Sequence, residues 1–450
     1  GVKRMQEAPG LVWFRRDLRL ADNPAWDAAT AAHRHVIACF VLEPKLLDAA
    51  SPARRNQLLA HLQGLDRELR ALGGALVVRS GNAEKAIPSL VAESSATAIY
   101  LNHDPSPFSQ TRDAAVSAAT GVAIHQYAGS VVHESGAVLT RRGTLSQVFT
   151  PFFRVWATTP RTPWPDGGAG EPITLDSESI PELSGAPRQT GGERAAWDRV
   201  TAWLEHVDNY ASDRDRPDID GTSDLSADLK FGTLSPRTLV DVVGDSTAGR
   251  AAFVRQIAWR DWWAHMLAER PTLADIPVRP EYAAVRWLDD HEGFDAWSGG
   301  QTGFPIVDAG MRQLVTEGWI HGRVRMLCAS FLVKDLLIDW RRGERFFRHH
   351  LIDADLAQNA GNWQWVAGTG PDAAPYFRIF NPTTQSQKFD PQGDYIRRWV
   401  PELSGLPKSE IHDPWKHGSL PLGVDYVAPI VDHLVARTQT LAAYKEARPA

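Results

Sequence analysis

The stretch LVWFRRDLRLADNP, residues 11–24, decides the first part of the fold. Residues 11–14 are apolar, as in a buried parallel strand, and Asp22-Asn23-Pro24 is a typical start of a helix. Short apolar runs at residues 36–42, 75–78, 98–101 and 122–127 repeat this alternation of strand and helix. The order predicts an α/β domain with a doubly wound parallel sheet over residues 1–135.

The turn after the first strand argues against one common enzyme class. Residues 13–17 read WFRRD, without the GxGxxG pattern that binds a dinucleotide phosphate, so we do not expect a dinucleotide dehydrogenase. The sequence also contains no P-loop, HExxH or GxSxG pattern, which removes the commonest NTPases, zinc proteases and serine hydrolases.

The composition changes along the chain. Residues 157–192 are rich in Pro, Gly, Ser and Thr, which is typical of a linker or a long wrapped loop. After residue 193 strand patterns nearly vanish, and apolar residues within 253–267, 306–316 and 325–340 recur at three-to-four spacing. We therefore expect a connector at residues 136–195 and a large all-helical domain at residues 196–450.

The overall composition is that of an ordinary globular protein. The 450 residues carry a formal charge of −6, and no apolar run approaches the roughly 18 residues of a membrane span. Cys39 and Cys328 lie far apart in sequence, which argues against a disulfide scaffold or a CxxC metal site. Residues 1–10 lack a signal-peptide core, so we expect a cytoplasmic protein, and one that acts as a monomer.

Two segments indicate binding chemistry, each beside a structural alternative. Residues 321–350 hold seven Arg and Lys against three Asp and Glu, a net +4, which suits a solvated helix face or a phosphate-binding surface. Gln256, Trp259, Arg260 and Trp263 share one face of a helix, which fits a core seam or a site for a planar ring equally well.

Two further clusters are polar. Tyr210 and the hydroxyls of Thr222, Ser223 and Ser226 precede an apolar helix, where they suit an anionic phosphate, although helix capping explains one or two of them. Residues 352–365 combine carboxylates, amides and indoles, which suit metal ligands or acceptors for ribose hydroxyls. The absence of paired His residues nearby weakens the metal alternative, and we expect no metal site.

Longer motifs show a resemblance to a known family. The stretches LVWFRRDLRLADNPA at 11–25, GFPIVDAGMRQLVTEGWIHGRVRM at 303–326 and IDADLAQNAGNWQW at 352–365 resemble the photolyase/cryptochrome family, most closely the microbial cyclobutane pyrimidine dimer (deoxyribodipyrimidine) photolyases. The resemblance implies an N-terminal antenna domain and a helical FAD-binding domain. It implies a carbon–carbon lyase that repairs DNA by splitting pyrimidine dimers with an electron from photoexcited reduced FAD.

The resemblance also assigns residues to FAD. Arg325 is expected to pair with Asp353, and Asn359 to face the flavin N5, where an amide can accept or donate a hydrogen bond. The whole implied set of FAD contacts is Tyr210, Thr222, Ser223, Leu225, Ser226, Arg325, Asp353, Asp355 and Asn359.

A tryptophan series follows from the same resemblance. Trp363, Trp340 and Trp287 match a chain that leads from the flavin to the surface. Indoles are readily oxidised, so a spaced series passes a positive charge outward and reduces the photoexcited flavin. This role accounts for part of the 17 Trp residues in the sequence.

On the DNA side, the resemblance implies a pocket for a flipped-out dimer. Trp259 and Trp365 match its aromatic walls and Met326 a softer contact; a damaged pair is poorly stacked, so its extrusion costs less than that of normal bases. The implied phosphate contacts are Arg214, Arg260, Arg323 and Arg378.

Two lesion-contacting positions depart from the dimer photolyases. Gln256 stands where they usually carry Glu, and Gly322 where they usually carry Asn. Glutamine can donate to a pyrimidine O4 and accept from N3–H, but it is a weaker proton donor than a carboxylic acid. Glutamine here also occurs in (6–4) photolyases; those usually place a second His where Gly322 stands, so we favour the cyclobutane dimer as substrate.

The antenna chromophore is a separate question. Phe108 and Ser109 replace the residues that folate-binding members use, whereas Asp104 and Glu43 resemble a pocket for 8-hydroxy-5-deazaflavin. We therefore expect 8-hydroxy-5-deazaflavin rather than methenyltetrahydrofolate, with an empty pocket as the alternative.

Two rival functions fit the same resemblance. A cryptochrome-like blue-light photoreceptor would use the same flavin and tryptophans, but such proteins often carry long C-terminal extensions, and this sequence ends soon after the helical domain. Trp259, Met326 and Trp365 also argue against it. A DNA-binding flavoprotein without repair activity is supported only by Gln256 and Gly322.

Overall fold

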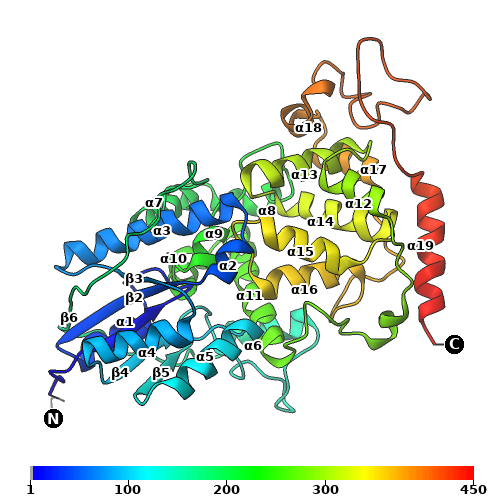
Figure 1. The fold of residues 1–450 in the computed structure, drawn as a ribbon. Coiled ribbons are helices and arrows are strands. Elements are labelled where there is room, and N and C mark those ends of the chain that lie inside the picture. The colour runs from blue at the N-terminus through cyan, green and yellow to red at the C-terminus, as the bar shows by residue number, and fades with distance from the viewer. Residues whose placement is uncertain (1–3, 450) are drawn as a thin grey trace. The chain divides into compact units, whose positions relative to one another are not determined.

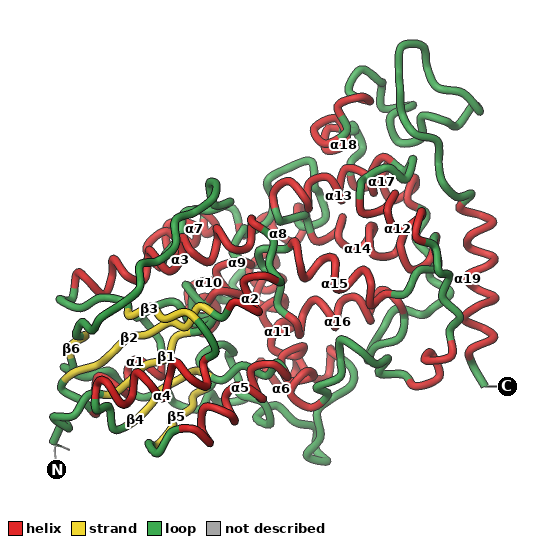
Figure 2. Tube along the Cα trace, in the orientation of Figure 1, coloured by secondary structure: helices red, strands yellow, loops and turns green. Residues whose placement is uncertain are grey.

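The computed structural model describes residues 4–449, whose helices and strands are shown in Figures 1 and 2. Contacts divide the chain into two compact units. The N-terminal unit comprises the chain up to Asp208 together with Ser223–Pro271, and the C-terminal unit comprises Asn209–Thr222 and the chain from Thr272 onward. The domain boundaries expected at residues 135 and 195 stay a prediction. Within residues 4–449, no helix has the length and apolar character needed to cross a membrane.

A parallel sheet forms the centre of the N-terminal unit. Its strand order is β3-β2-β1-β4-β5, the short β6 pairs with β2, and all of these pairings are parallel. This topology confirms the predicted α/β fold. The strands are β1 (Gly10–Phe14), β2 (His35–Leu42), β3 (Val77–Ser80), β4 (Ala98–Asn102), β5 (Ala123–Tyr127) and β6 (Glu171–Pro172).

Helices connect these strands and extend the unit. The first begins as the sequence indicates, because the Asn23 side chain accepts a hydrogen bond from the backbone N–H of Trp26 at 3.2 Å and Pro24 takes the first helical position. The helices of this unit are α1 (Pro24–Ala32), α2 (Pro44–Asp48), α3 (Pro52–Ala71), α4 (Ala83–Ser94), α5 (Pro107–Ala119), α6 (Phe149–Thr158), α7 (Glu193–Leu204), α9 (Ser226–Phe231), α10 (Pro236–Val243) and α11 (Ala248–Glu269).

The long helix α11 is fixed by a buried carboxylate. Asp261 accepts hydrogen bonds from the backbone N–H groups of Val132 and His133, at 3.1 and 3.0 Å, and from the Trp156 indole at 2.9 Å. A buried charge is tolerated when several donors surround it in this way. Asp261 thereby holds α11 against the segment that precedes and includes α6.

The C-terminal unit is helical, which confirms the second half of the fold prediction. Its helices are α8 (Tyr210–Asp213), α12 (His291–Ser298), α13 (Pro305–Glu317), α14 (Gly322–Ser330), α15 (Trp340–His350), α16 (Leu356–Ala367), α17 (Pro382–Phe389), α18 (Asp394–Trp399) and α19 (His433–Ala447), and α14 continues into a π-helical turn at Phe331–Asp335.

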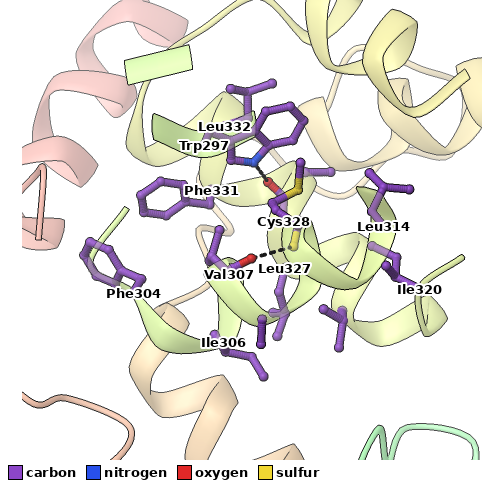
Figure 3. Packing of buried hydrophobic residues seen from close by; sticks show 14 of the residues in the cluster. Trp297, Phe304, Ile306, Val307, Leu314, Ile320, Leu327, Cys328, Phe331 and Leu332 are labelled. Carbon is purple, nitrogen blue, oxygen red and sulfur yellow. Dashed lines mark hydrogen bonds between the residues drawn. The ribbon is translucent and has the colours of Figure 1, made fainter. Parts of the chain in front are cut away.

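The main core of this unit packs α12, α13 and α14 together (Figure 3). The indole of Trp297 donates a hydrogen bond to the Cys328 carbonyl at 3.0 Å, and the Cys328 thiol lies 3.6 Å from the Val307 carbonyl. Burial raises the pKa of this thiol, so Cys328 acts as a packing residue. The helices that carry the predicted site residues are therefore supported by a tightly packed hydrophobic core.

Candidate functional site

Helix α16 carries three of the residues that the sequence singled out. Asn359 and Trp363 are four residues apart and buried, and so lie on one face of the helix, while Trp365 is half-buried. Asp355 caps the helix by accepting from the backbone N–H of Ala357 at 2.9 Å, and it also accepts from the Gln358 amide at 3.2 Å. One helix thus holds an amide, two indoles and a capping carboxylate.

The predicted Arg325–Asp353 pair is present in the C-terminal unit. Two parallel hydrogen bonds of 3.1 and 2.7 Å join the guanidinium of Arg325 to the two carboxylate oxygens of Asp353. Arg325 also donates to the Ile320 carbonyl at 2.7 Å, and the side chain of Asp353 is only 4% exposed. A guanidinium with both edges used in this way is fixed before any ligand binds.

The amide of Asn359 is oriented by a residue that the sequence analysis missed. Its Nδ2 donates to the backbone carbonyl of Glu344, on α15, at 3.0 Å. Because this bond identifies the nitrogen, it also identifies Oδ1 as the acceptor on the other branch of the amide.

Glu344 itself is a buried carboxyl. Its side chain is fully buried, Oε2 pairs with Arg348 at 2.9 Å, and Oε1 has no hydrogen-bond partner among the described residues. Burial raises its pKa to about 7, although Arg348 acts in the opposite direction. No sequence pattern indicated this burial, because Glu344 lies in a strongly charged segment that resembles a solvated face.

The hydroxyl cluster is divided between the two units. Tyr210 and Thr222 belong to the C-terminal unit, where the Arg214 guanidinium lies 5.5 Å from the centre of the Tyr210 ring. Burial raises the pKa of the Tyr210 phenol. In the N-terminal unit, Ser223 accepts from the backbone N–H of Leu225 at 3.2 Å, and Ser226 begins α9.

The three tryptophans of the expected series differ in exposure. Trp363 and Trp340 are 2% and 0% exposed, whereas Trp287 is half-buried and meets the ring of Tyr444 edge-on at 5.9 Å. Trp363 and Trp340 are thus both buried, whereas Trp287 is partly exposed to solvent, and the electron path through the three stays a prediction.

In the N-terminal unit, α11 presents the predicted lesion-facing residues. Trp259 is half-buried and stacks on Phe149, with ring centres 3.8 Å apart and planes 12° apart. The nearby Gln256 is half-buried, and its amide makes no hydrogen bond among residues 4–449. Trp263 is buried, so the residues predicted to share one helix face are divided between the core and the surface. The sequence analysis missed Phe149, whose only signal is the aromatic run at 149–153.

The predicted phosphate contacts have different environments. Arg260 is 5% exposed and donates to the carbonyls of Ser130 and Leu229 at 2.5 and 3.1 Å. In the C-terminal unit Arg378 is exposed, Arg214 is half-buried, and Arg323 is half-buried and ion-paired; Met326, one turn further along α14, is half-buried as well. Whether these four arginines bind DNA stays a prediction.

The two antenna candidates are buried in the N-terminal unit. Glu43 pairs with Arg112 at 3.0 Å and accepts from the backbone N–H of Ala83. Asp104 accepts from the Ser109 hydroxyl at 3.0 Å. Burial raises the pKa of Asp104, but Arg16 and the Ser106 N–H outweigh it and bring the pKa down to about 2. Both carboxylates are therefore ordered.

Similarity to known proteins agrees with this arrangement. The chain combines a doubly wound α/β unit with a helical unit that holds an ordered Arg–Asp–Asn set. Residues 10–168 match the family "DNA photolyase" and residues 253–446 match "FAD binding domain of DNA photolyase". The deoxyribodipyrimidine photo-lyase of Escherichia coli K12 is 40% identical, over 97% of this chain and 98% of its own. The chain belongs to the DNA photolyase family.

Two solved structures have the same fold. A class III photolyase from Agrobacterium tumefaciens is 37% identical with a TM-score of 0.90, and covers 99% of this chain and 98% of its own. An archaeal photolyase from Sulfolobus tokodaii, described as containing two FAD molecules that imply a novel light-harvesting cofactor, is 34% identical with a TM-score of 0.88. It covers 97% of this chain and 100% of its own.

The residues of the C-terminal unit fit FAD. The donors and acceptors that a flavin and a ribityl chain need are already ordered by the protein: the Arg325–Asp353 pair, the capping Asp355 and the Asn359 amide with its free carbonyl branch. No group of three or more His, Cys, Asp or Glu side chains that would hold a metal ion occurs within residues 4–449.

The raised pKa of Glu344 predicts a pH-dependent stability. Since the pKa is about 7 in the folded protein and 4.5 ordinarily, the neutral carboxyl stabilises the fold fully below pH 4.5. That stability is lost as the pH rises through about 7. Glu344→Gln, which imitates the neutral form, should therefore gain in free energy of unfolding relative to the unchanged protein between pH 4.5 and 8, by up to about 3 kcal/mol.

Urea unfolding at pH 5 and pH 8 measures this gain. The exposed Glu292→Gln is the matched control, and its difference from the unchanged protein should be the same at both pH values. An equal difference at both pH values for Glu344→Gln would contradict the assigned burial effect.

Proposed function

We propose that this photolyase repairs DNA by splitting cyclobutane pyrimidine dimers in a light-dependent reaction. When bound, reduced FAD would absorb blue or near-ultraviolet light and supply the electron that opens the cyclobutane ring. This electron returns after ring opening, so the reaction involves no net oxidation or reduction. The protein binds the cofactor and the lesion, orients them and excludes water. The relatives named as deoxyribodipyrimidine photo-lyases support this substrate.

The observation that carries the proposal is the composition of α16. Asn359, buried and fixed by the Glu344 carbonyl, is the residue assigned to the flavin N5, and its oriented Oδ1 accepts a hydrogen bond there. Trp363, on the same face, begins the tryptophan series, and the half-buried Trp365 offers an indole to a base. Cofactor, electron path and lesion contact therefore share one rigid element.

Lesion binding is assigned to stacking and phosphate contacts. Phe149 stacks on the Trp259 indole and fixes its plane. The half-buried indole is assigned to a flipped-out base. In the C-terminal unit, Met326 and Trp365 are assigned to lesion contacts. Arg214, Arg323 and Arg378 are assigned to backbone phosphates, and the buried Arg260 acts through the carbonyls that it holds.

Repair by the purified, chemically reduced protein tests this function. One oligonucleotide carries a single cyclobutane thymine dimer and another a single (6–4) product, each under blue light and in the dark. We expect light-dependent loss of the cyclobutane lesion alone. Repair of the (6–4) product instead would show that Gln256 is the better guide to the substrate. Loss of neither lesion, with flavin photoreduction intact, would favour a photoreceptor.

The two unusual lesion positions give a gain-of-function prediction. A Cβ at Gly322 would have no heavy atom within 4 Å, so an asparagine fits without a clash. Gly322→Asn adds a hydrogen-bond partner for the lesion, and Gln256→Glu restores a stronger proton donor. Each of these two variants should raise the repair yield per absorbed photon, with Gly322→Ala as the control that adds a side chain without an amide. No rise in either variant would contradict the assigned lesion contacts.

The tryptophan series predicts a separation of two activities. Trp340→Phe should slow photoreduction of oxidised flavin at least tenfold because the middle oxidisable ring is lost, yet spare repair by pre-reduced enzyme. Trp297→Phe is a stringent control, since this buried indole lies 6.1 Å from Trp363 but outside the series. Absorbance changes under illumination measure the rate of flavin photoreduction and the rate of repair in each variant. Normal photoreduction in Trp340→Phe would reject the assigned path.

For the antenna we propose 8-hydroxy-5-deazaflavin near Asp104 and Glu43, whose ordered carboxylates can accept hydrogen bonds from N–H groups of such a ring. Titration with 8-hydroxy-5-deazaflavin and with methenyltetrahydrofolate, followed by energy transfer to FAD, compares the two. We expect the deazaflavin to bind and Asp104→Asn to weaken it. Binding of folate alone, of a second FAD, or of nothing would contradict this choice. The cytoplasmic location and the monomeric state stay predictions.

A further inference from the structure

Arg323 is held by an ion pair within the C-terminal unit. Its Nη2 and Nε both donate to Oδ1 of Asp215, at 3.0 and 3.3 Å, and its guanidinium lies over the ring of Phe389, with the central carbon 4.5 Å from the ring centre. The side chains of Arg323 and Asp215 are 20% and 40% exposed. The guanidinium is therefore fixed in a place that solvent and ligands can still reach.

A carboxylate and a phosphate compete for the same donors. Both present anionic oxygens to the N–H groups of a guanidinium, and arginine binds either one with the same planar edge. A partly exposed ion pair contributes only about 0–1 kcal/mol, so a phosphate can displace its carboxylate. While the carboxylate stays nearby, however, its charge also repels the incoming phosphate.

We propose that Asp215 occupies the phosphate position on Arg323 in the free protein and thereby limits the affinity for the DNA backbone. The proposal rests on the proposed function, because it takes Arg323 as a DNA contact. Binding exchanges the carboxylate for a phosphate, and release of repaired DNA restores the ion pair. Asp215 is thus a positioning residue that keeps Arg323 ordered and hastens the departure of product.

The surrounding chain supports a dedicated role for Asp215. It lies between α8 and the end of the segment Asn209–Thr222, and its partner Arg323 lies far along the chain in the first turn of α14. Asp218 in the same segment pairs instead with its neighbour Arg216 at 2.5 Å. Asp220 is exposed and forms no hydrogen bond or ion pair among the described residues, which makes it a matched control for charge alone.

Binding of undamaged duplex DNA, measured by fluorescence anisotropy at several salt concentrations, tests the proposal. Asp215→Asn should bind about three- to tenfold more tightly at low salt, and the gain should shrink as salt rises. Asp220→Asn removes the same charge and should change the affinity less than twofold. In an Arg323→Ala background, Asp215→Asn should give no gain, as a double-mutant cycle requires for a direct pair.

The outcomes separate this proposal from the proposed function. If Arg323→Ala leaves the affinity and its salt dependence unchanged, the assignment of Arg323 to DNA fails, and the role of Asp215 fails with it. If Arg323→Ala weakens binding but Asp215→Asn does not tighten it, only the role of Asp215 is overturned. A gain that persists without Arg323, or that Asp220→Asn equals, also overturns it. Equal urea midpoints show that the variants remain folded.

Discussion

Close packing of α15 on α16 at Gly343 is the constraint on which the candidate site depends. A Cβ at this position would lie 2.2 Å from the Trp363 ring and 2.7 Å from Leu332, so any larger residue would force the helices apart. The close approach brings the Glu344 carbonyl within 3.0 Å of the Asn359 amide. The absence of a side chain at Gly343 therefore permits both the orientation of Asn359 and the burial of Trp363.

Local signals predicted the elements well, because they depend on neighbours in the sequence. The Asn23-Pro24 start of α1 is present, and the apolar runs at residues 36–42 and 98–101 lie within β2 and β4. The helical period within 253–267 likewise found α11. The helical period does not show what a helix packs against. Asp261 accepts hydrogen bonds from residues more than a hundred positions away, and these contacts place α11 in the N-terminal unit.

The expected site residues came from motifs, and the residues that contact and orient them could not be predicted in that way. Arg325, Asp353 and Asn359 stand in long stretches that resemble a family, so no geometry was needed. Glu344, Asp215 and Phe149 act through contacts 15 to 110 positions away, which charge or composition cannot reveal. Counting charges over 321–350 also could not find the partners outside that segment, which are Asp215 for Arg323 and Asp353 for Arg325.

Burial distinguishes the two arginine pairs of α14, although the same helix carries both. Asp353 is almost fully buried, so separating it from Arg325 would leave an uncompensated charge in a poorly solvated place, and this pair is structural. Asp215 is 40% exposed, so water or another anion can replace it as the partner of Arg323 at little cost. Two residues apart on one helix, the Arg325 guanidinium is therefore held by a buried partner, and the Arg323 guanidinium by an exchangeable one. Under the proposed role of Asp215, this difference leaves the Arg323 guanidinium available to DNA only where a phosphate replaces the carboxylate.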